Sequence, residues 1–365
     1  MGKDYKIKRE LLSPPGDTIR ESIDKLGMNQ NELAERLGKN VKNVNQIIKG
    51  KEPITSDTAI ALEKVLGIPA DFWLERERLY RKELTEIMFD ENLEQSIEWL
   101  KDFPINEMKK FEWIPDLDDS IELIKAMLKF FGIASPEQWE QIYVKDANSV
   151  AFRMSLKHTN EPQAISAWLR KGELDARELK LSEFSKDAFR NVLNEIKNIA
   201  YKQPKNFKER LQEICSESGV ALVYTPNLPK ATISGAARWI FDITVPLIQL
   251  SGRYKTNDHF WFTFFHEAGH ILLHGKKDIF LEDVEGAKLD KAKEEEADMF
   301  ARKILLGNAE YDELTHHFNI TEEVILKYSK KAKTHPGVII GRLQHDGFIQ
   351  HSKFNNLKEK INLFE

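Results

Sequence analysis

Hydrophobic residues near the N-terminus recur at the spacing of two short helices. The first begins at Asn29, which forms a capping-box pattern with Glu32, and it ends at Gly38. The second is expected over residues 41–49, after an N-cap at Asn40. The apolar residues that would pack the two helices together are Leu33, Ala34, Leu37, Val44 and Ile47. Two short helices joined by a glycine-containing turn are typical of a helix-turn-helix.

The C-terminal half shows a strand-like segment followed by a long helical one. Alternating character over Val245–Ser251 predicts a strand. We then expect a helix from His259 to His274, with Asp258 as its N-cap and Gly275 as a left-handed residue after its end. Large apolar side chains along this helix predict that much of it is buried.

Helical periodicity also marks the middle of the chain, but the pattern there does not indicate a function. The helical stretches are Leu93–Leu100, Ser120–Phe131, Pro136–Ile142 and Ala188–Ala200. Such a region fits a helical spacer, a dimer interface or a surface that recognises a partner. With further helices after Leu306, the pattern predicts a mainly α fold with a small β-sheet, of the α+β class.

Charge and cysteine content indicate in which cellular compartment the protein is expected and which partners are not. The formal net charge of −5 at pH 7 gives no general attraction to nucleic acid. Cys215 is the single cysteine, which excludes an internal disulfide framework and favours a reducing compartment. The N-terminus lacks the apolar stretch of a signal peptide, and no apolar run is long enough to span a membrane. We therefore expect a cytoplasmic protein with no membrane partner.

The second short helix carries side chains suited to DNA. No acidic residue occurs between Arg36 and Lys51. The side chains left exposed on this helix are amides and lysines, namely Lys42, Asn43, Asn45, Gln46 and Lys49. Amides can bond adenine edges bidentately, and lysines suit phosphates. Residues 1–85 carry 16 Lys and Arg against 14 Asp and Glu, so binding must depend on a local patch. The alternative is a helical domain used only for dimerisation.

This region resembles the lambda-repressor-like helix-turn-helix domains and, more narrowly, the HigA-type antitoxins. The resemblance covers residues 10–85 and rests on Asn29-Gln30-Asn31-Glu32-Leu33-Ala34, Ile54-Thr55-x-Asp57-Thr58-Ala59 and Phe72-Trp73-Leu74. It implies that the DNA contacts are Gln30, Asn40, Lys42, Asn43, Asn45 and Gln46. It also implies a homodimer on a two-fold operator in double-stranded DNA.

The segment His266-Glu267-Ala268-Gly269-His270 carries a second candidate chemistry. Two histidines four residues apart lie on one face of a helix, so both can bind one Zn²⁺. Glu267 would lie beside the metal as the catalytic base for a bound water. Gly269 disfavours the helix, and we expect it to allow close approach of backbone or substrate to the metal. The alternative is an ordinary amphipathic helix with two hydrogen-bonded histidines.

A third ligand must come from another segment. The position ten residues after His266 is Lys276, which excludes one familiar ligand arrangement. His274 is interpreted as a helix-end residue, with a supporting role left open. Among three consecutive glutamates, we expect Glu294 to be the ligand because it shares a helical stripe with small and apolar residues. That stripe continues through Ala297, Ala301 and Leu305.

The residues around this glutamate have expected roles of their own. Asp298, one turn after Glu294, can accept the free imidazole N–H of a ligand histidine and fix its tautomer. Glu295 and Glu296 are expected in solvent at the start of their helix, where the helix dipole favours acidic residues.

Two separated motifs together resemble the ImmA/IrrE family of metallo-endopeptidases. They are His266-Glu267-x-x-His270 and, 24 residues later, Glu294-x-x-Ala297-Asp298-x-Phe300-Ala301. The resemblance implies a zincin-like zinc peptidase that acts on a regulatory protein. It also implies a short sheet whose edge strand holds an extended substrate, and residues 232–241 or the following strand are the candidates for that edge.

The chain of 365 residues is thus expected to have four parts. They are a helix-turn-helix domain (1–85), a helical linker or interaction region (86–204), a zincin-like metallopeptidase domain (205–310) and a C-terminal helical extension (311–365). Our leading hypothesis is a DNA-binding regulator that cleaves a regulatory protein with Zn²⁺ and Glu267. The rival is a HigA-like antitoxin and autorepressor that neutralises a toxin by binding, with little or no proteolysis.

Overall fold

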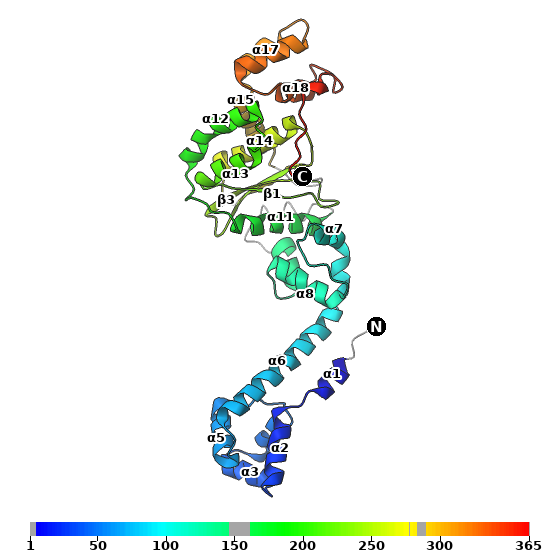
Figure 1. The fold of residues 1–365 in the computed structure, drawn as a ribbon, viewed down its shortest axis with the longest axis vertical. Helices are drawn as coiled ribbons and strands as arrows, with labels where there is room; N and C mark the ends of the chain where they lie inside the picture. The colour runs from blue at the N-terminus through cyan, green and yellow to red at the C-terminus, as the bar shows by residue number, and fades with distance from the viewer. Residues whose placement is uncertain (1–4, 146–160, 277, 283–289, 365) are drawn as a thin grey trace. The chain divides into compact units, whose positions relative to one another are not determined.

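The computed structural model describes residues 5–145, 161–276, 278–282 and 290–364. Within them the chain is mostly helical, with a four-stranded sheet in the C-terminal part, so the predicted α+β class is confirmed (Figure 1). The chain divides into two compact units, Met1–Glu98 and Trp99–Glu365. The boundary between the units lies later than residue 85, the expected end of the first domain, because the last helix of the first unit continues to Glu94.

From residue 5 onward, the N-terminal unit is built of helices and the loops between them. Its helices are α1 (Tyr5–Leu11), α2 (Pro15–Lys25), α3 (Gln30–Leu37), α4 (Val41–Ile48), α5 (Ser56–Leu66) and α6 (Ala70–Glu94). The core between them includes the five residues expected to join α3 and α4, four of them buried and Leu37 packed against these from a partly buried position. Trp73 of α6 is fully buried in the same core, and its indole donates a hydrogen bond to the carbonyl of Ile68.

Local side-chain caps fix the two short helices. Asn29 Oδ1 accepts hydrogen bonds from the backbone N–H groups of Asn31 and Glu32, each at 3.0 Å. Gly38 has a left-handed backbone (φ 65°) and ends α3. Asn40 Oδ1 accepts from the N–H of Asn43 at 2.7 Å and begins α4. The capped helix-turn-helix predicted over these residues is therefore present, with α4 one residue shorter than expected.

The sheet of the C-terminal unit has the order β1-β3-β2-β4. The strands are β1 (Ala221–Tyr224), β2 (Gly235–Ile240), β3 (Val245–Leu250) and β4 (Ile279–Leu281). β1 pairs with β3 in parallel, whereas β2 pairs antiparallel with both β3 and β4. The expectation that residues 232–241 or the following strand form the edge is wrong, because both are central. Among the described residues, the edges are β1 and β4.

Helices cover both faces of this sheet (Figure 1). One face packs against α11 (Pro162–Arg177). The other face packs against α13 (Phe207–Glu217) and α14 (Asn257–Leu273), and α12 (Lys186–Lys202) lies against them. The largest core of the unit lies between the sheet and this second layer, and it includes the fully buried Trp261, Phe264 and Phe265 of α14. This burial holds α14 rigidly on the sheet.

The ends of α14 differ from the prediction. The N-cap is Thr256 rather than Asp258. Asp258 is instead a buried residue of the first turn, where its Oδ2 accepts from Lys358 Nζ at 2.5 Å. His274 in extended backbone follows the last helical residue, and Gly275 does not adopt the left-handed conformation expected of it. The error at the start arises because backbone pairing of Thr256 and Asn257 with residues 359 and 360, distant in sequence, determines this end.

The remaining elements surround this assembly. Before the sheet lie η1 (Ile97–Asp102), α7 (Ile105–Lys110), α8 (Ser120–Phe131), α9 (Pro136–Trp139) and η2 (Glu140–Lys145). After it come α15 (Lys291–Leu305), α16 (Asn308–Thr315), α17 (Glu322–Ala332), α18 (Pro336–His345) and η3 (Asn355–Leu357). Trp99 and Trp139 pack edge to face with ring centroids 6.4 Å apart, beside Phe103 and Phe131, and thus lie in an aromatic cluster.

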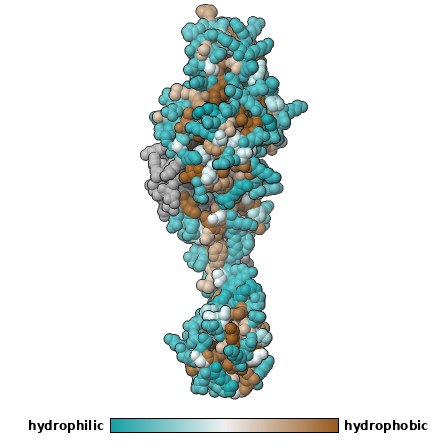
Figure 2. Space-filling model, turned by 90° about the vertical axis from the view of Figure 1, so that its left-hand side faces the viewer, coloured by the Kyte–Doolittle hydropathy of each residue, from teal (hydrophilic) through white to brown (hydrophobic). Residues whose placement is uncertain are grey.

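Figure 2 shows one face of the molecule, on which hydrophilic residues predominate and hydrophobic ones form small patches. Within the described part of the chain, no helix is long and apolar enough to cross a membrane.

Candidate metal centre

The candidate metal centre lies where α14 and α15 pack closely together. A Cβ at Gly269 would come within 3.1 Å of Phe300 Cδ1 and 3.3 Å of the Ala297 Cα. A glycine at this position therefore lets the backbone of α15 approach α14. The predicted close approach is present, and it is made by the neighbouring helix. It places the first turns of α15 over the histidines of α14.

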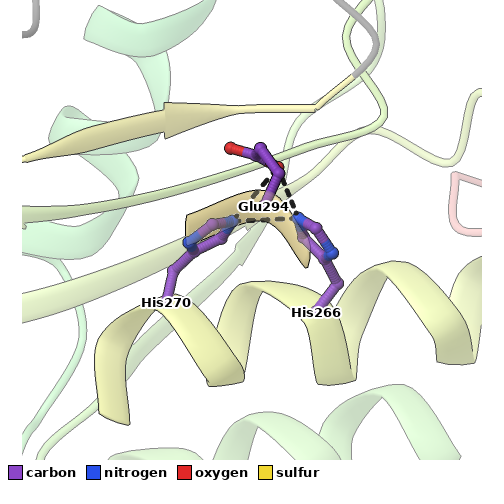
Figure 3. Close-up of side chains that lie close together, drawn as sticks. All are labelled: His266, His270 and Glu294. Carbon is purple, nitrogen blue, oxygen red and sulfur yellow. Dashed lines mark hydrogen bonds and ion pairs between the residues drawn. The ribbon is translucent and has the colours of Figure 1, made fainter. Parts of the chain in front are cut away.

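Three side chains from the two helices converge at this point (Figure 3). His266 Nε2 lies 2.9 Å from His270 Nε2 and 3.1 Å from Glu294 Oε2. The distance from His270 Nε2 to the same carboxylate oxygen is 3.5 Å. Both histidines are buried, with exposed fractions of 3% and 2%. The two imidazoles extend from α14 towards the glutamate, as Figure 3 shows.

This donor set fits a zinc ion. Nitrogen and oxygen ligands about 2.0–2.2 Å from a tetrahedral zinc lie roughly 3.3 Å from one another. The three distances of 2.9, 3.1 and 3.5 Å are close to that spacing. Two imidazoles and one carboxylate also leave a coordination position open, which is typical of a catalytic site.

Each histidine has a partner on its other ring nitrogen. His266 Nδ1 lies 2.9 Å from Asp298 Oδ1, the contact expected from the sequence. His270 Nδ1 lies 2.9 Å from His274 Nδ1, and His274 Nε2 lies 3.1 Å from Glu296 Oε2. Such contacts orient a ligand imidazole and fix its tautomer. Glu296 is exposed, as expected from the sequence, and its carboxylate also contacts His274.

Phe280 of β4 completes the wall around His270. The two rings stack with centroids 3.7 Å apart and an interplanar angle of 12°. Sequence reasoning missed this contact, because a three-residue strand in a charged segment gives no periodic signal. The spacing of His274, four residues after His270, was the signal that could have identified its supporting role.

The two ligand histidines differ in their protonation, because carboxylates determine the pKa of His266 and burial that of His270. Burial alone would lower the pKa of His266, but hydrogen bonds to Asp298 and Glu294 outweigh it and raise this pKa to about 11. Burial lowers the pKa of His270 to about 4. Burial would raise the pKa of Glu294, but hydrogen bonds to both histidines lower it to about 2. Without a metal, one proton at neutral pH therefore lies between His266 and Glu294.

Glu267 points from α14 towards the sheet and is fully buried. A Cβ at Gly235 of β2 would lie 2.7 Å from Glu267 Oε1 and 2.6 Å from Thr263 Cγ2. The missing side chain at Gly235 thus leaves the space that the glutamate occupies. The carboxylate is thereby held between the metal helix and β2, one residue from a metal ligand.

The predicted DNA-contacting residues lie on α4 and at the starts of α3 and α4. Lys42 and Asn40 are exposed, whereas Gln30, Asn45 and Gln46 are partly buried. Asn43 is also partly buried, and its side-chain amide donates to Glu52. The sequence did not indicate the contact between Asn43 and Glu52, because Glu52 lies just outside the segment without acidic residues. The exposed face of α4 is therefore polar, and Glu52 lies next to it.

Comparison with known proteins supports both parts of this description. Residues 19–73 match the helix-turn-helix family, and residues 215–343 match the IrrE N-terminal-like domain. Over 73 residues the chain is 32% identical to "Virulence-associated protein I" of Dichelobacter nodosus, which covers 20% of this chain and 68% of that protein.

A second relative matches a stretch of similar length. Over 60 residues the chain is 33% identical to "Uncharacterized HTH-type transcriptional regulator YddM" of Escherichia coli (strain K12), covering 16% of this chain and 64% of that protein. The chain therefore belongs to the helix-turn-helix family through its N-terminal unit and carries an IrrE N-terminal-like domain in its C-terminal unit.

Proposed function

We propose that this protein is a DNA-binding transcriptional regulator whose C-terminal unit is a zinc-dependent endopeptidase that cleaves a regulatory protein partner. The observation that carries the proposal is the convergence of His266, His270 and Glu294, whose ligand atoms lie within 4.8 Å of one another. Glu267, the adjacent buried carboxylate, supplies the base that such a site needs. The match to the IrrE N-terminal-like domain supports this assignment.

The residues of the site divide the chemistry between them. When bound, zinc supplies a Lewis acid that polarises a carbonyl and lowers the pKa of a water molecule. Asp298 accepts a hydrogen bond from the Nδ1–H of His266 and leaves the Nε2 of this histidine available as a ligand. Glu267 takes the proton of the attacking water and passes it to the leaving amine. Burial by α15 and β4 limits the access of bulk water to these groups.

The substrate of this site is an extended segment of a protein. β4 pairs with β2 on one side, and its other side is an edge of the sheet within the described residues. An extended chain can bind such an edge by backbone hydrogen bonds. Because Phe280 of β4 stacks on His270, a segment bound there would pass close to the metal ligands.

The N-terminal unit binds DNA and thereby brings the peptidase to the operator. The polar face of α4 offers amides for base edges and lysines for phosphates, and the helix-turn-helix match supports this use. We assign the contacts to Gln30, Asn40, Lys42, Asn43, Asn45 and Gln46. A homodimer would place two such helices on a two-fold operator.

The decisive experiment is the substitution Glu267→Gln in the full-length protein. We expect this variant to keep its zinc and to lose cleavage of a co-expressed partner by about 10²- to 10⁴-fold, the usual contribution of a general base. Co-purification with the inactive variant, followed by mapping of new N-termini after addition of wild type, identifies the substrate. The matched control is Glu295→Gln, an exposed neighbour of the third ligand, which should cleave normally. Equal cleavage by Glu267→Gln would reject the role of this residue.

A HigA-like antitoxin and autorepressor is the second candidate. The helix-turn-helix match supports its repressor part, whereas capture of a toxin rests on the sequence resemblance alone. In that case the C-terminal unit would capture a toxin without cutting it. If a neighbouring gene encodes a toxin, and the Glu267→Gln variant neutralises that toxin as well as the wild type does, this second function would be favoured.

A further inference from the structure

A cavity lies beside the metal centre, on the side of α14 that faces α18. It encloses about 610 Å³ and is bounded by α14, α15, α18 and the C-terminal segment, residues 351–361. Small-molecule sites usually enclose about 300–1,000 Å³, so this cavity has the size of a ligand site. Phe262, Leu305 and Val338 give it an apolar wall.

The polar part of the wall is predominantly basic. Arg302 of α15, Arg342 of α18 and Lys360 of the C-terminal segment line the cavity. It also contains two carboxylates, Asp258 and Asp298, but each already has a partner. Asp258 is bound by Lys358, and Asp298 by His266. Four basic side chains, counting Lys358, thus line the cavity against two carboxylates, and this excess of positive charge favours an anionic ligand.

Arg342 is held in position at one end of this cavity. Its guanidinium lies 3.6 Å from the centroid of the Tyr311 ring, and its Nη1 donates to the Leu306 carbonyl at 2.7 Å. Its Nε is buried without a hydrogen-bond partner, and Asp346 Oδ2 lies 3.7 Å away. Burial lowers the pKa of Arg342, and the charge of Arg302 contributes to this effect. Two neighbouring guanidiniums in a partly buried wall form a suitable cradle for an acidic group.

The C-terminal segment closes the opposite side of the cavity. The N–H of Asn257 donates to the Glu359 carbonyl at 2.9 Å, and the N–H of Ile361 donates to the Lys255 carbonyl at 3.1 Å. These bonds hold the segment against the start of α14. The cavity is therefore formed by ordered backbone on several sides and does not depend on a single loop.

Asp298 connects the cavity with the metal centre. Its Oδ1 lies 2.9 Å from His266 Nδ1, while its Oδ2 lies 3.6 Å from Arg302 Nη2. Asp298 therefore bridges His266 and Arg302 through its two carboxylate oxygens. An anion bound at Arg302 would neutralise this guanidinium and leave more of the negative charge of Asp298 to the contact with His266.

We propose that this cavity binds a small organic anion with an apolar body, whose acidic group lies between Arg302 and Arg342. We further propose that Asp298 couples its occupation to metal affinity. The binding stands independently of the peptidase assignment, whereas the coupling rests on the proposed zinc site. Since coupling is reciprocal, zinc must tighten anion binding by the same factor by which the anion tightens zinc binding.

The test uses the fluorescent probe anilinonaphthalene sulfonate, which has an apolar body and one acidic group. Titration of the full-length, metal-free protein should show one saturable site per chain, from which decanoate displaces the probe. Arg302→Gln should weaken binding about tenfold, the usual effect of losing one charge-assisted hydrogen bond. Lys303→Gln removes the same charge from the next, exposed position of α15 and should leave the affinity unchanged. Absence of saturable binding, or equal affinity in the Arg302 and Lys303 variants, would overturn the site.

The coupling is tested by repeating the titration with zinc. At zinc concentrations that load both proteins, probe affinity should rise several-fold in the wild type, and this increase should be lost in Asp298→Asn while metal-free binding persists. Equal affinity with and without zinc, in a wild type shown to contain the metal, would overturn the coupling. Glu267→Gln should bind the probe normally, so failure of the peptidase assignment would not be mistaken for failure of this site.

Discussion

The helix-turn-helix and the metal centre hold their functional side chains in opposite environments. The polar residues of α4 lie at the surface, whereas His266, His270 and Glu267 are buried within a packed core. A surface residue can change without affecting its neighbours, but a buried polar group must keep every partner that compensates for lost solvent. We therefore expect substitutions in the first region to change binding alone, and those in the second to change stability and function together.

The largest effect in this comparison is expected for Asp298→Asn. The amide cannot support His266 as the carboxylate does, so zinc affinity should fall by about 10- to 100-fold. The free energy of unfolding should fall as well, whereas operator affinity should stay unchanged. Zinc titration against a chelator, thermal unfolding and a DNA-binding assay on one preparation measure all three. A variant that loses DNA binding to the same degree would contradict the separation of the two regions.

The pH dependence of zinc binding sharpens the same contrast. Between the pKa of His270 near 4 and that of His266 near 11, one proton must leave His266 when zinc binds. The apparent affinity should therefore rise about tenfold per pH unit in this window. Calorimetry in two buffers of different ionisation enthalpy should find about one proton released. Zinc binding without proton release would contradict the protonation described here.

The metal-free protein should show the opposite trend with pH. The folded-state pKa of His266 lies above its ordinary value of 6.5, so its protonation stabilises the fold fully below that pH. This stabilisation should decrease as pH rises towards 11. Urea unfolding of the metal-free protein at pH 6 and pH 9 should therefore give lower stability at pH 9 through this group, and His266→Gln should flatten the difference.

The smallest effect is expected for Glu52→Gln in the helix-turn-helix. The change releases the Asn43 amide from a charged partner and removes a negative charge beside α4. Operator affinity should rise by about two- to fivefold, the scale of one exposed ion pair, and the gain should shrink at high salt. Asp24→Asn, an exposed change at the end of α2, is the matched control. A large loss of stability in Glu52→Gln would contradict its surface role.

The sequence predicted those features whose signals are local or periodic. Asn29 and Asn40 act within three residues of themselves, so their caps could be placed from the chain alone. The stripe through Glu294, Ala297 and Ala301 identified the face of α15 that packs on α14.

The errors concern contacts made across the fold. Asp258 looked like a cap, but Lys358, one hundred positions later, binds it inside the core. The edge of the sheet was predicted wrongly because β4, which is only three residues long and follows α14 in the sequence, pairs with β2. No periodicity within one segment carries such information.

The zinc content of matched variants tests the central claim most directly. We predict one zinc ion per chain in the wild type and in Glu295→Ala, and its loss from Glu294→Ala, when each protein is dialysed against the same zinc buffer. Absence of zinc from the wild type, or equal zinc in the two glutamate variants, would contradict the proposal that His266, His270 and Glu294 form a metal centre.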